Sequence, residues 1–250
     1  MIEPWRLGKL RRKWVRRVGK RLLRSLNGFF GRQSLVGDPA IFESGRFPFT
    51  LELERNWQAI RDECADLLAQ HQDLPHLGAI SRESRRISRG SDWKVFLFHG
   101  FGHRSERNCA RCPKTAALVD AIPEVTNAWF SILPPSATVP THSGISRGLL
   151  RCHLGLMIPS QRERCYMDIG GERIVWEEGR SVVFDDMNEH SVTNDTNEFR
   201  AILLVDFHRP LSRRAALLSR ALLAVMRRTA YVRDGYRREM TWEEEFYAST

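Results

Sequence analysis

Residues 149–158 have the sequence Leu-Leu-Arg-Cys-His-Leu-Gly-Leu-Met-Ile, and this stretch decides the fold. Successive side chains of a β-strand point to opposite faces, so its alternating pattern predicts a strand with one face on a core. Arg151 and His153 share the second face. Two such groups are costly to bury alone, so this face is either exposed to solvent or lined by an anion or a carboxylate. The apolar face carries Leu150, Cys152, Leu154 and Leu156.

Short apolar segments lie on both sides of this strand, and turn residues such as Pro134, Pro135 and Gly179 separate them. Many short strands with such breaks indicate a sandwich or jelly roll. A helix is expected over residues 53–71, before the first strand. The expected strands are 93–98, 128–133, 149–158, 164–169, 172–176, 181–184 and 200–207.

The composition is that of a globular protein. The chain has 250 residues, 42% of them apolar and 10% aromatic, and is long enough for one well-buried domain with extensions. Its five cysteines are an odd number without a dense pattern, which favours reduced thiols. No secretory signal is visible, and no stretch approaches the roughly 20 apolar residues of a membrane-spanning helix. These features favour a cytoplasmic protein.

Positive charge gathers at both ends of the chain, whose formal net charge is +9. Residues 1–32 hold eleven Lys or Arg and one acid, and residues 209–239 hold nine Arg and two acids. The stretch between them is therefore mildly acidic. Apolar residues recur every four positions in the N-terminal arm, which predicts a helix with an apolar stripe and a cationic remainder. They are Leu10, Trp14, Val18, Leu22 and Leu26.

Such a helix is typical of segments that lie in a membrane interface. Each basic residue near an anionic surface is worth about 1 kcal/mol, so residues 1–32 and 209–239 predict contact with an anionic membrane. For a cytoplasmic protein this would be a peripheral position at the inner face. The alternatives are a helix docked on the acidic body of the protein itself, another protein as partner, and an organelle transit peptide. Nucleic-acid binding is not expected.

These patterns divide the chain into three parts: a basic amphipathic arm at 1–35, a β-rich domain with a helical lead-in at 36–210, and a basic helical extension at 211–250. Arg220 interrupts the apolar run of the extension, which argues against a membrane-spanning helix. One face of the helix in this extension is expected to carry Leu211, Ala215, Leu218, Leu222 and Val225.

A set of polar residues spread over about 70 positions forms the candidate site. Two imidazoles can hold one metal ion and suit Fe(II). A guanidinium pairs with a carboxylate through two parallel, charge-assisted hydrogen bonds. The set therefore suggests an iron-dependent oxygenase with a small dicarboxylate, 2-oxoglutarate, as cosubstrate. Its members are Ser131, His142, Arg151, His153, His190 and Arg200.

From residue 93 to residue 210 the chain resembles the aspartyl/asparaginyl β-hydroxylase family, which includes peptide hydroxylases and bacterial lipid-acyl hydroxylases. The spacings agree as well, with eleven residues from Ser131 to His142, nine more to Arg151 and ten from His190 to Arg200. The matching motifs are Cys-Pro-Lys-Thr (112–115), Phe-Ser-Ile-Leu-Pro-Pro (130–135), His-Ser-Gly (142–144), Arg-Cys-His-Leu-Gly-Leu-Met-Ile-Pro (151–159), Trp-Glu-Glu-Gly (176–179), Phe-Asp-Asp (184–186), Glu-His (189–190) and Phe-Arg (199–200).

This resemblance implies a double-stranded β-helix, or jelly roll. With the sequence patterns above, the expected fold is mainly β, flanked by α-helices and by basic amphipathic terminal helices. It implies an Fe(II) enzyme that uses 2-oxoglutarate and O2 as cosubstrates, with His142 and His190 as the iron ligands. The 2-oxoglutarate would be bound by Ser131, Arg151, His153 and Arg200. His142, His190 and Arg200 would then carry the catalysis.

Gly144 departs from the usual iron site, which has two histidines and a carboxylate two residues after the first histidine. No acid is available at position 144, so the interpretation is two histidines plus water. The peptide-hydroxylating branch of the family resembles this chain in having glycine there. The open position also leaves room for chloride, as in iron halogenases, to which the site is similar in that gap alone.

Three functions are compatible with these features. The first is hydroxylation of the β-carbon of Asp or Asn in a peptide or protein, which Gly144 and the mildly acidic body favour. The second is the same chemistry on an acyl chain of a membrane lipid of the lipid A or ornithine-lipid type, which the basic arms favour. The third is a non-catalytic, membrane-associated jelly roll, against which the intact set of candidate residues argues.

Overall fold

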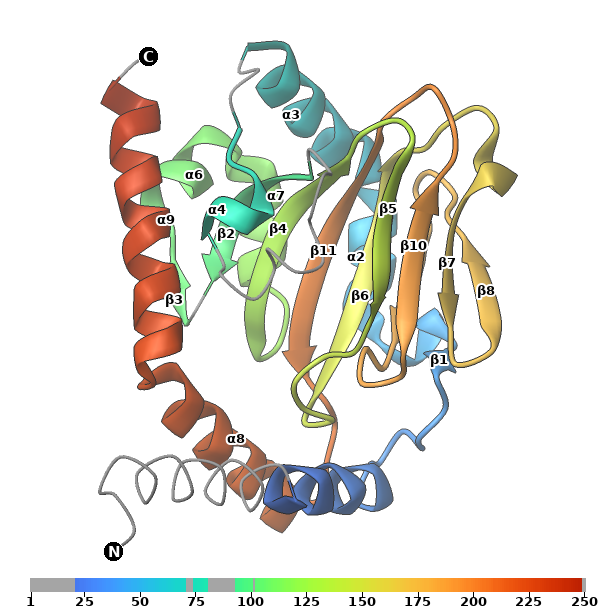
Figure 1. Ribbon diagram of the computed structural model, residues 1–250, viewed down its shortest axis with the longest axis vertical. Helices are drawn as coiled ribbons and strands as arrows, with labels where there is room; N and C mark the ends of the chain where they lie inside the picture. Colours follow the sequence, from blue (N-terminus) through green and yellow to red (C-terminus); the bar gives the residue numbers. More distant parts are fainter. Residues whose placement is uncertain (1–20, 71–73, 81–92, 101, 249–250) are drawn as a thin grey trace, which may run out of the picture.

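Two antiparallel β-sheets form the body of the protein in a computed structural model that describes residues 21–70, 74–80, 93–100 and 102–248 (Figure 1). The larger sheet has the order β1-β9-β6-β11-β4-β2-β3 and the smaller the order β5-β10-β7-β8. The strands of the larger sheet are β1 (Ile41–Phe42), β2 (Lys94–Gly100), β3 (His103–Arg104), β4 (Val125–Leu133), β6 (Leu149–Met157), β9 (Ser181–Phe184) and β11 (Arg200–His208). Those of the smaller sheet are β5 (Ala137–His142), β7 (Cys165–Ile169), β8 (Glu172–Val175) and β10 (His190–Asn194).

The chain crosses between the sheets after nearly every strand. From β4 it passes to β5, back to β6, over to β7 and β8, back to β9, over to β10 and back to β11. This alternation of antiparallel strands makes the double-stranded β-helix, so the predicted fold is confirmed. The consequence for the site is that residues far apart in sequence face one another across the gap between the sheets.

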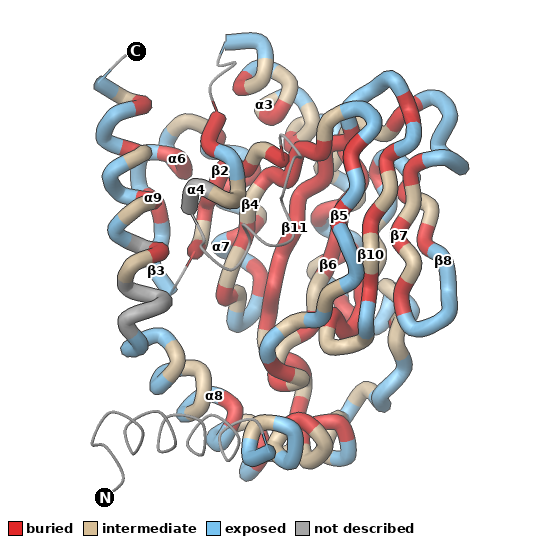
Figure 2. Tube along the Cα trace, in the orientation of Figure 1, coloured by how far each residue is buried: buried red, intermediate tan, exposed pale blue. Residues whose placement is uncertain are grey.

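Each face of the larger sheet packs on its own apolar core, and buried positions follow the central strands (Figure 2). One core lies between the sheets and joins Val95, Ile202 and Leu204 of the larger sheet to Val139 and Met167 of the smaller one. The other core lies between the larger sheet and helices α2 (Pro48–Arg55), α3 (Trp57–Gln70), α6 (Glu106–Arg111) and α7 (Pro113–Asp120). Short elements complete the body: η1 (Ser44–Arg46), α4 (Leu77–Ile80) and η2 (Arg162–Arg164).

The helical lead-in differs from the single helix expected at 53–71. It consists of α2 and α3, with the break at Asn56. The Asn56 side-chain amide donates to the carbonyl oxygen of Glu52 at 2.8 Å, which ends α2. Pro48 at the first turn starts the helix earlier than the apolar pattern indicates, because its missing N–H needs no partner there.

Both chain ends contribute helices that pack together below the sheets. Residues 21–32 are helical and contact α8 (Arg213–Arg227) through a cluster centred on Phe30, Leu211 and Ala215. Ser34 pairs with Leu211 as an isolated β-bridge. Residues 1–20 of the expected arm lie outside the described residues, and the three-part division of the chain stays a prediction.

The expected apolar face of the extension is only partly covered by the protein. Ala215 is buried and Leu222 contacts the cluster, but Leu218 is 41% exposed and Val225 is 63% exposed. The face of α8 that packs on the protein is formed instead by Ala215, Ser219 and Leu222, so a second apolar stripe is left in solvent. Among the described residues, no helix is both long and apolar enough to cross a membrane.

The last helix, α9 (Ala230–Ala248), packs beside α8 and α4 and buries Phe246 in the core under the larger sheet. It also buries two carboxylates, Glu239 and Glu243. Ser105 Oγ donates to Glu243 at 3.0 Å, whereas Glu239 Oε2 has no hydrogen-bond partner in the part of the chain described. Burial, with the neighbouring Glu243, raises the pKa of the Glu239 carboxyl from 4.5 to about 8.

This pKa predicts a loss of stability with rising pH. In the folded protein the Glu239 carboxyl keeps its proton up to about pH 8, whereas in the unfolded chain it loses its proton near pH 4.5. Its contribution to the free energy of unfolding therefore falls between about pH 5 and pH 8. Glu239→Gln imitates the protonated form and should melt about 2–8 °C above the wild type at pH 8, with little difference at pH 5, in thermal unfolding followed by circular dichroism. Glu244→Gln, at an exposed position of α9, is the matched control; a Glu239→Gln profile parallel to the wild type would contradict the assignment.

Candidate active site

His142 and His190 lie side by side at one end of the smaller sheet. His142 ends β5, His190 begins β10, and the two residues are direct partners in the antiparallel pairing of these strands. Their ring centroids are 4.2 Å apart. Partners in a cross-strand pair have their side chains on the same face, so both rings enter the gap between the sheets. The two predicted metal ligands are thereby brought together.

Both imidazoles are fixed in the same way. His142 Nδ1 lies 2.9 Å from the carbonyl oxygen of Pro140, and His190 Nδ1 lies 2.9 Å from that of Asn188. A carbonyl oxygen can only accept, so each Nδ1 carries the proton and each Nε2 keeps its lone pair. Burial lowers the pKa of both rings, to about 4 for His190, where His142 adds to the effect. The pair therefore offers two neutral nitrogen donors at neutral pH, as metal ligation requires.

Gly144 shows why no carboxylate follows His142. A Cβ atom at this position would lie 2.2 Å from Asp186 Oδ1. The backbone N–H of Gly144 donates to the carbonyl oxygen of Asp186 at 2.7 Å, which holds the two loops in this close approach. Among the described residues, no group of three or more His, Cys, Asp or Glu side chains could hold a metal ion. The protein side of the candidate centre is thus a pair of histidines.

Arg200 carries a buried positive charge at the opposite end of the gap. It begins β11, is 2% exposed, and lies with its guanidinium 4.7 Å from the ring centroid of Trp176. Its Nε has no hydrogen-bond partner, and no carboxylate pairs with it in the part of the chain described. Burial lowers the pKa of this guanidinium to about 10. A buried cation without a counter-ion is costly, so the site is suited to an anionic ligand.

His153 on β6 and Ser131 on β4 lie on the same inner face of the larger sheet, on the two strands that flank β11. His153 is 5% exposed, and neither ring nitrogen has a hydrogen-bond partner among the described groups. Its ring centroid is 4.8 Å from that of Phe184, and burial lowers its pKa well below the usual value, so it stays neutral. The Ser131 hydroxyl accepts a hydrogen bond from Trp93 Nε1 at 2.9 Å and keeps its own proton free to donate.

Arg151 is the member of the predicted set that already has partners. Its Nε and Nη2 donate to the two carboxylate oxygens of Asp206, at 2.7 and 3.0 Å, and Nη2 is 3.3 Å from Asp186. Burial would lower the pKa of Arg151, but the two carboxylates raise it above its ordinary value. Burial also raises the pKa of the Asp186 carboxyl, to about 6. The contribution of Arg151 to dicarboxylate binding stays a prediction.

The gap therefore offers two kinds of donor to a ligand. At one end stand the two Nε2 atoms of His142 and His190, and between the sheets stand the unpartnered polar atoms of Arg200 and His153. Unpartnered buried polar groups are rare in folded proteins and mark places where a ligand completes the hydrogen bonding. These donors fit a divalent iron ion and a small dicarboxylate.

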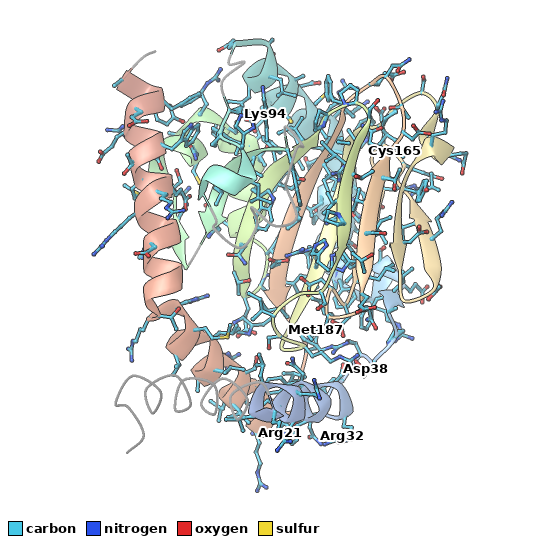
Figure 3. All side chains as sticks on the ribbon, in the orientation of Figure 1. Arg21, Arg32, Asp38, Lys94, Cys165 and Met187 are labelled. Atoms are coloured by element: carbon cyan, nitrogen blue, oxygen red, sulfur yellow. The ribbon has the colours of Figure 1, made fainter. Side chains whose placement is uncertain are left out.

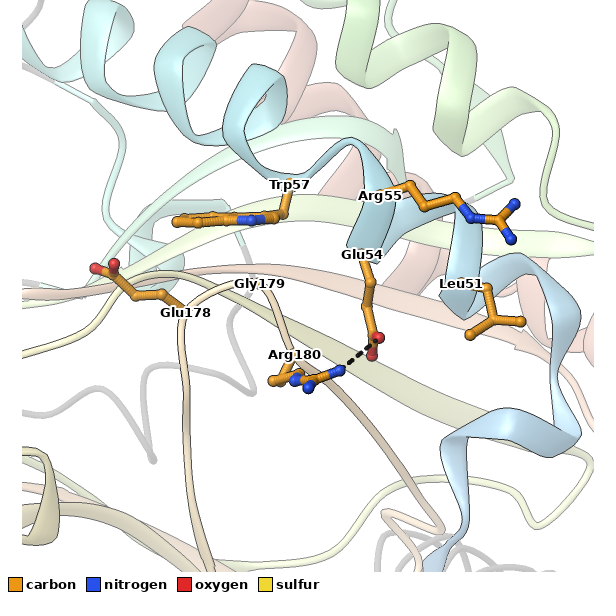
Figure 4. Close-up of a pocket in the computed structure, with 7 residues that line it drawn as sticks. All are labelled: Leu51, Glu54, Arg55, Trp57, Glu178, Gly179 and Arg180. Carbon is orange, nitrogen blue, oxygen red and sulfur yellow. Dashed lines mark ion pairs between the residues drawn. The ribbon is translucent and has the colours of Figure 1, made fainter.

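A separate hollow of about 380 Å³ lies outside this site, between α2, the start of α3 and the turn before β9 (Figure 4). None of the six candidate residues lines it. Its wall includes Glu54, which pairs with Arg180 at 3.5 Å and accepts from the N–H of Ser181 at 2.8 Å. These contacts join the helical lead-in to β9, so we assign the hollow a structural role.

Sequence reasoning missed two contacts that shape the site: Trp176 against Arg200 and Asp206 against Arg151. Asp186, in the loop before His190, also pairs with Arg151. One signal was present for Asp206. Arg151 and His153 on one face of a strand required a carboxylate or an anion, and Asp206 lies on the neighbouring strand directly opposite Arg151. Nothing in the local sequence pattern indicates that Trp176 lies against Arg200, because β8, which ends just before Trp176, and β11 belong to different sheets.

The fold and the site define a double-stranded β-helix protein with a two-histidine centre, of the kind found in oxygenases that act as hydroxylases. The family model described as aspartyl/asparaginyl beta-hydroxylase matches residues 54–210, and the chain belongs to this family. It is an enzyme of the hydroxylase class.

Two relatives show how far the similarity extends. The ornithine lipid ester-linked acyl 2-hydroxylase of Rhizobium tropici is 36% identical over 213 residues, which cover 85% of this chain and 76% of that protein. The human aspartyl/asparaginyl beta-hydroxylase is 35% identical over 173 residues, which cover 67% of this chain and 22% of that much longer protein. A solved structure of a Pseudomonas putida prolyl-4-hydroxylase covers 61% of this chain and 86% of its own, with 18% identity and a TM-score of 0.42.

The close approach at Gly144 predicts a specific sensitivity. Gly144→Ala should lower the free energy of unfolding by about 1–3 kcal/mol, because the new methyl group must displace the Asp186 carboxylate. Gly45→Ala is the matched control, since a Cβ there meets nothing within 4 Å. Urea unfolding of both variants measures the difference. Equal stability of the two variants would show that the loops of residues 144 and 186 are further apart than described.

Proposed function

We propose that this protein is an Fe(II)- and 2-oxoglutarate-dependent dioxygenase that hydroxylates an unactivated C–H bond. The observation that carries the proposal is the combination of two neutral, oriented imidazoles with a buried guanidinium that has no counter-ion among the described residues. The first suits Fe(II), and the second suits the distal carboxylate of a dicarboxylate.

Each residue then has a defined task. His142 and His190 hold the iron through Nε2, while Pro140 and Asn188 keep the rings in the required tautomer. Arg200 and Ser131 bind the distal carboxylate of 2-oxoglutarate, and Arg151 and His153 bind its other end. Iron, 2-oxoglutarate and O2 together supply the oxidising chemistry, as cofactors do in enzymes of this kind.

The protein also excludes water from the reacting groups. Phe184 lies with its ring centroid 4.8 Å from that of His153 and 6.1 Å from that of His190, and Trp176 covers the Arg200 guanidinium. Apolar walls around charged ligands strengthen the electrostatic contacts made inside them. The arrangement therefore favours tight binding of a small dianion in a dry site.

The first substrate class is a peptide or protein, hydroxylated at the β-carbon of Asp or Asn. Its support is the family model over residues 54–210, the similarity to the human relative and the absence of a metal-binding carboxylate at Gly144. A peptide substrate would have to reach the two histidines from the end of the gap where β5 ends and β10 begins.

A second substrate class, the acyl chain of a membrane lipid, is favoured by one observation. The match to the lipid hydroxylase of Rhizobium tropici spans 213 residues and therefore extends beyond the 54–210 segment into the terminal segments. The partner would then be an anionic membrane surface that the basic segments 1–32 and 209–239 contact, with the enzyme peripheral at the inner face of a membrane in the cytoplasm. The intact site argues against a non-catalytic role.

Anaerobic titration with Fe(II) and 2-oxoglutarate tests the proposed cofactors. The wild type should develop the weak visible charge-transfer band of the iron chelate, and His190→Ala should not. Arg200→Gln should raise the 2-oxoglutarate concentration at half-saturation by about 100-fold, because a buried carboxylate loses its paired charge.

Arg173→Gln is the control for Arg200→Gln, since Arg173 lies on β8, is exposed and pairs with Asp168. It should titrate like the wild type. A folded wild type without the band would refute the proposed cofactors, and an unchanged half-saturation in Arg200→Gln would assign carboxylate binding to another residue.

Consumption of 2-oxoglutarate distinguishes the two substrate classes. The true substrate raises the rate at which such an enzyme consumes 2-oxoglutarate, so we expect stimulation either by Asp- and Asn-containing peptides or by lipid extracts dispersed as vesicles. The His142→Ala variant supplies the background for both. Product analysis by mass spectrometry should show a gain of one oxygen atom in the stimulating substrate.

A further inference from the structure

The solvent-facing side of α8 carries an apolar stripe, which is unusual for a helix on the surface of a soluble domain. Leu217 is 65% exposed, Val225 is 63% exposed and Leu218 is 41% exposed. Leu217, the exposed Ala221 and Ala224, and Val225 recur at the i, i+4, i+7 and i+8 positions of one stripe, and Leu218 lies beside them. The opposite stripe packs on the protein, so α8 has two apolar faces and one of them is left open.

Basic residues border this open stripe. Arg213, Arg214 and Arg228 are exposed on α8 and at its end, and no acidic residue occurs from residue 210 to residue 229. The helix at 21–32 adds Leu22, which is 60% exposed, and the exposed Arg21 and Arg24. Exposed leucines among arginines, without acids, are the composition of a surface that enters the interface of an anionic bilayer.

The two helices form one unit, called here the docking platform and defined as residues 21–32 together with α8. Phe30, Leu211 and Ala215 form the buried contact between them, and Leu26 and Leu222 pack against it. Backbone hydrogen bonds of 2.9 Å from Leu35 N to Pro210 O and of 3.0 Å from Ser212 N to Gln33 O join the segments that follow and precede the helices. The platform is therefore a built surface rather than two loose ends.

The platform contacts the two loops that carry the histidine pair. Asn27 is buried; its Oδ1 accepts from the N–H of Arg147 at 3.1 Å, and its Nδ2 lies 3.7 Å from Met187 Sδ. Arg147 follows His142 by five residues, and Met187 precedes His190 by three. Figure 3 shows Met187 and Asp38 beside the helix that carries Arg21 and Arg32, at the end of the sheets nearest the platform.

Ion pairs reinforce this attachment. Asp38, just beyond the helix at 21–32, pairs with Arg147 at 2.7 Å and with Arg209 at 3.1 Å. Arg209 in turn lies 3.2 Å from Asp185 in the loop before His190, and the side chains of both residues are fully buried. A bilayer bound to the platform would therefore be held at a fixed position relative to the histidine end of the gap.

We propose that the docking platform binds an anionic lipid bilayer, with the Leu217–Val225 stripe of α8 in the interface, and that this places the histidine end of the site at the membrane, within reach of bilayer lipids. The second half of this inference rests on the proposed hydroxylase function. The first half does not, because docking requires neither iron nor 2-oxoglutarate.

Charge and apolar exposure together select the bilayer as occupant. A second copy of the chain packed on this face would bring its own arginines against Arg213 and Arg214, and like charges at an interface are unfavourable. An acidic partner without an apolar region would leave Leu217 and Val225 exposed to water. An anionic bilayer satisfies both kinds of side chain, with the arginines at the headgroups and the stripe below them.

Vesicle sedimentation of the full chain tests the docking. The wild type should bind vesicles of equal phosphatidylglycerol and phosphatidylcholine and should not bind pure phosphatidylcholine. Leu217→Gln/Val225→Gln should weaken binding by about tenfold or more, because two inserted side chains are lost. Arg213→Gln/Arg214→Gln should weaken it by about tenfold or more at low salt, with little added loss at high salt.

Leu51→Gln/Phe199→Gln is the matched control. These two residues are 45% and 42% exposed, so the control removes a similar apolar area from α2 and from the turn between β10 and β11. It should bind vesicles like the wild type. Equal binding by Leu217→Gln/Val225→Gln and the wild type would refute the assigned surface, as would a wild-type dimer that this variant converts to a monomer.

A second measurement separates docking from catalysis. With lipid extract as vesicles, Leu217→Gln/Val225→Gln should consume 2-oxoglutarate more slowly than the wild type while its anaerobic iron and 2-oxoglutarate titration stays unchanged. A lost titration band in the wild type would refute the proposed function and leave the docking result standing. Normal titration and vesicle binding, with no stimulation by any lipid and with stimulation by a peptide, would refute the acyl substrate.

Discussion

A buried guanidinium without a counter-ion is the constraint on which the rest of the site depends. Arg200 is 2% exposed at the first position of a central strand, with an indole on one side and no carboxylate partner among the described residues. Moving a charge out of water is expensive unless another charge compensates it, so the strands around it must be stable enough to bear this cost. The two apolar cores on either side of the larger sheet provide that stability. The contrast with Arg151 is instructive, because Asp206 and Asp186 compensate that charge within the protein.

Much of this arrangement could be predicted from the sequence, because side chains of different character alternate clearly in strands whose two faces have different surroundings. β6, β9 and β11 lie close to the ranges expected, and Arg151 and His153 do share the inner face of β6. The strands that hold the two histidines were missed. β5 contains Pro140 and β10 has the sequence His-Ser-Val-Thr-Asn, so their apolar content is low, although their buried and exposed positions alternate. They belong to the smaller sheet, whose outer face needs no apolar residues.

The positions of the candidate residues were predicted better than the residues around them. Motif spacing pointed to six residues, and the structure brings the two histidines into one cross-strand pair and places the other four on the inner face of the larger sheet. Contacts with residues such as Asp206 and Trp176 depend on which strands become neighbours. The residue pattern along one segment does not show which strands these are. The same holds for α8: Leu218 and Val225 fit the expected helical stripe, but the cluster of Phe30, Leu211 and Ala215 leaves them in solvent.

The bridge between Ser34 and Leu211 has a consequence for biosynthesis. The helix at 21–32 emerges early from the ribosome, yet its partners Leu211 and Ala215 are made about 180 residues later. At roughly 5–20 residues per second this helix waits on the order of 10–35 s before its apolar side can be covered. During that interval the nascent chain presents a cationic segment with exposed Leu26, Phe29 and Phe30, the kind of segment that chaperones and membrane surfaces capture first. The order of synthesis therefore leaves this helix uncovered until residues 211–215 have been made.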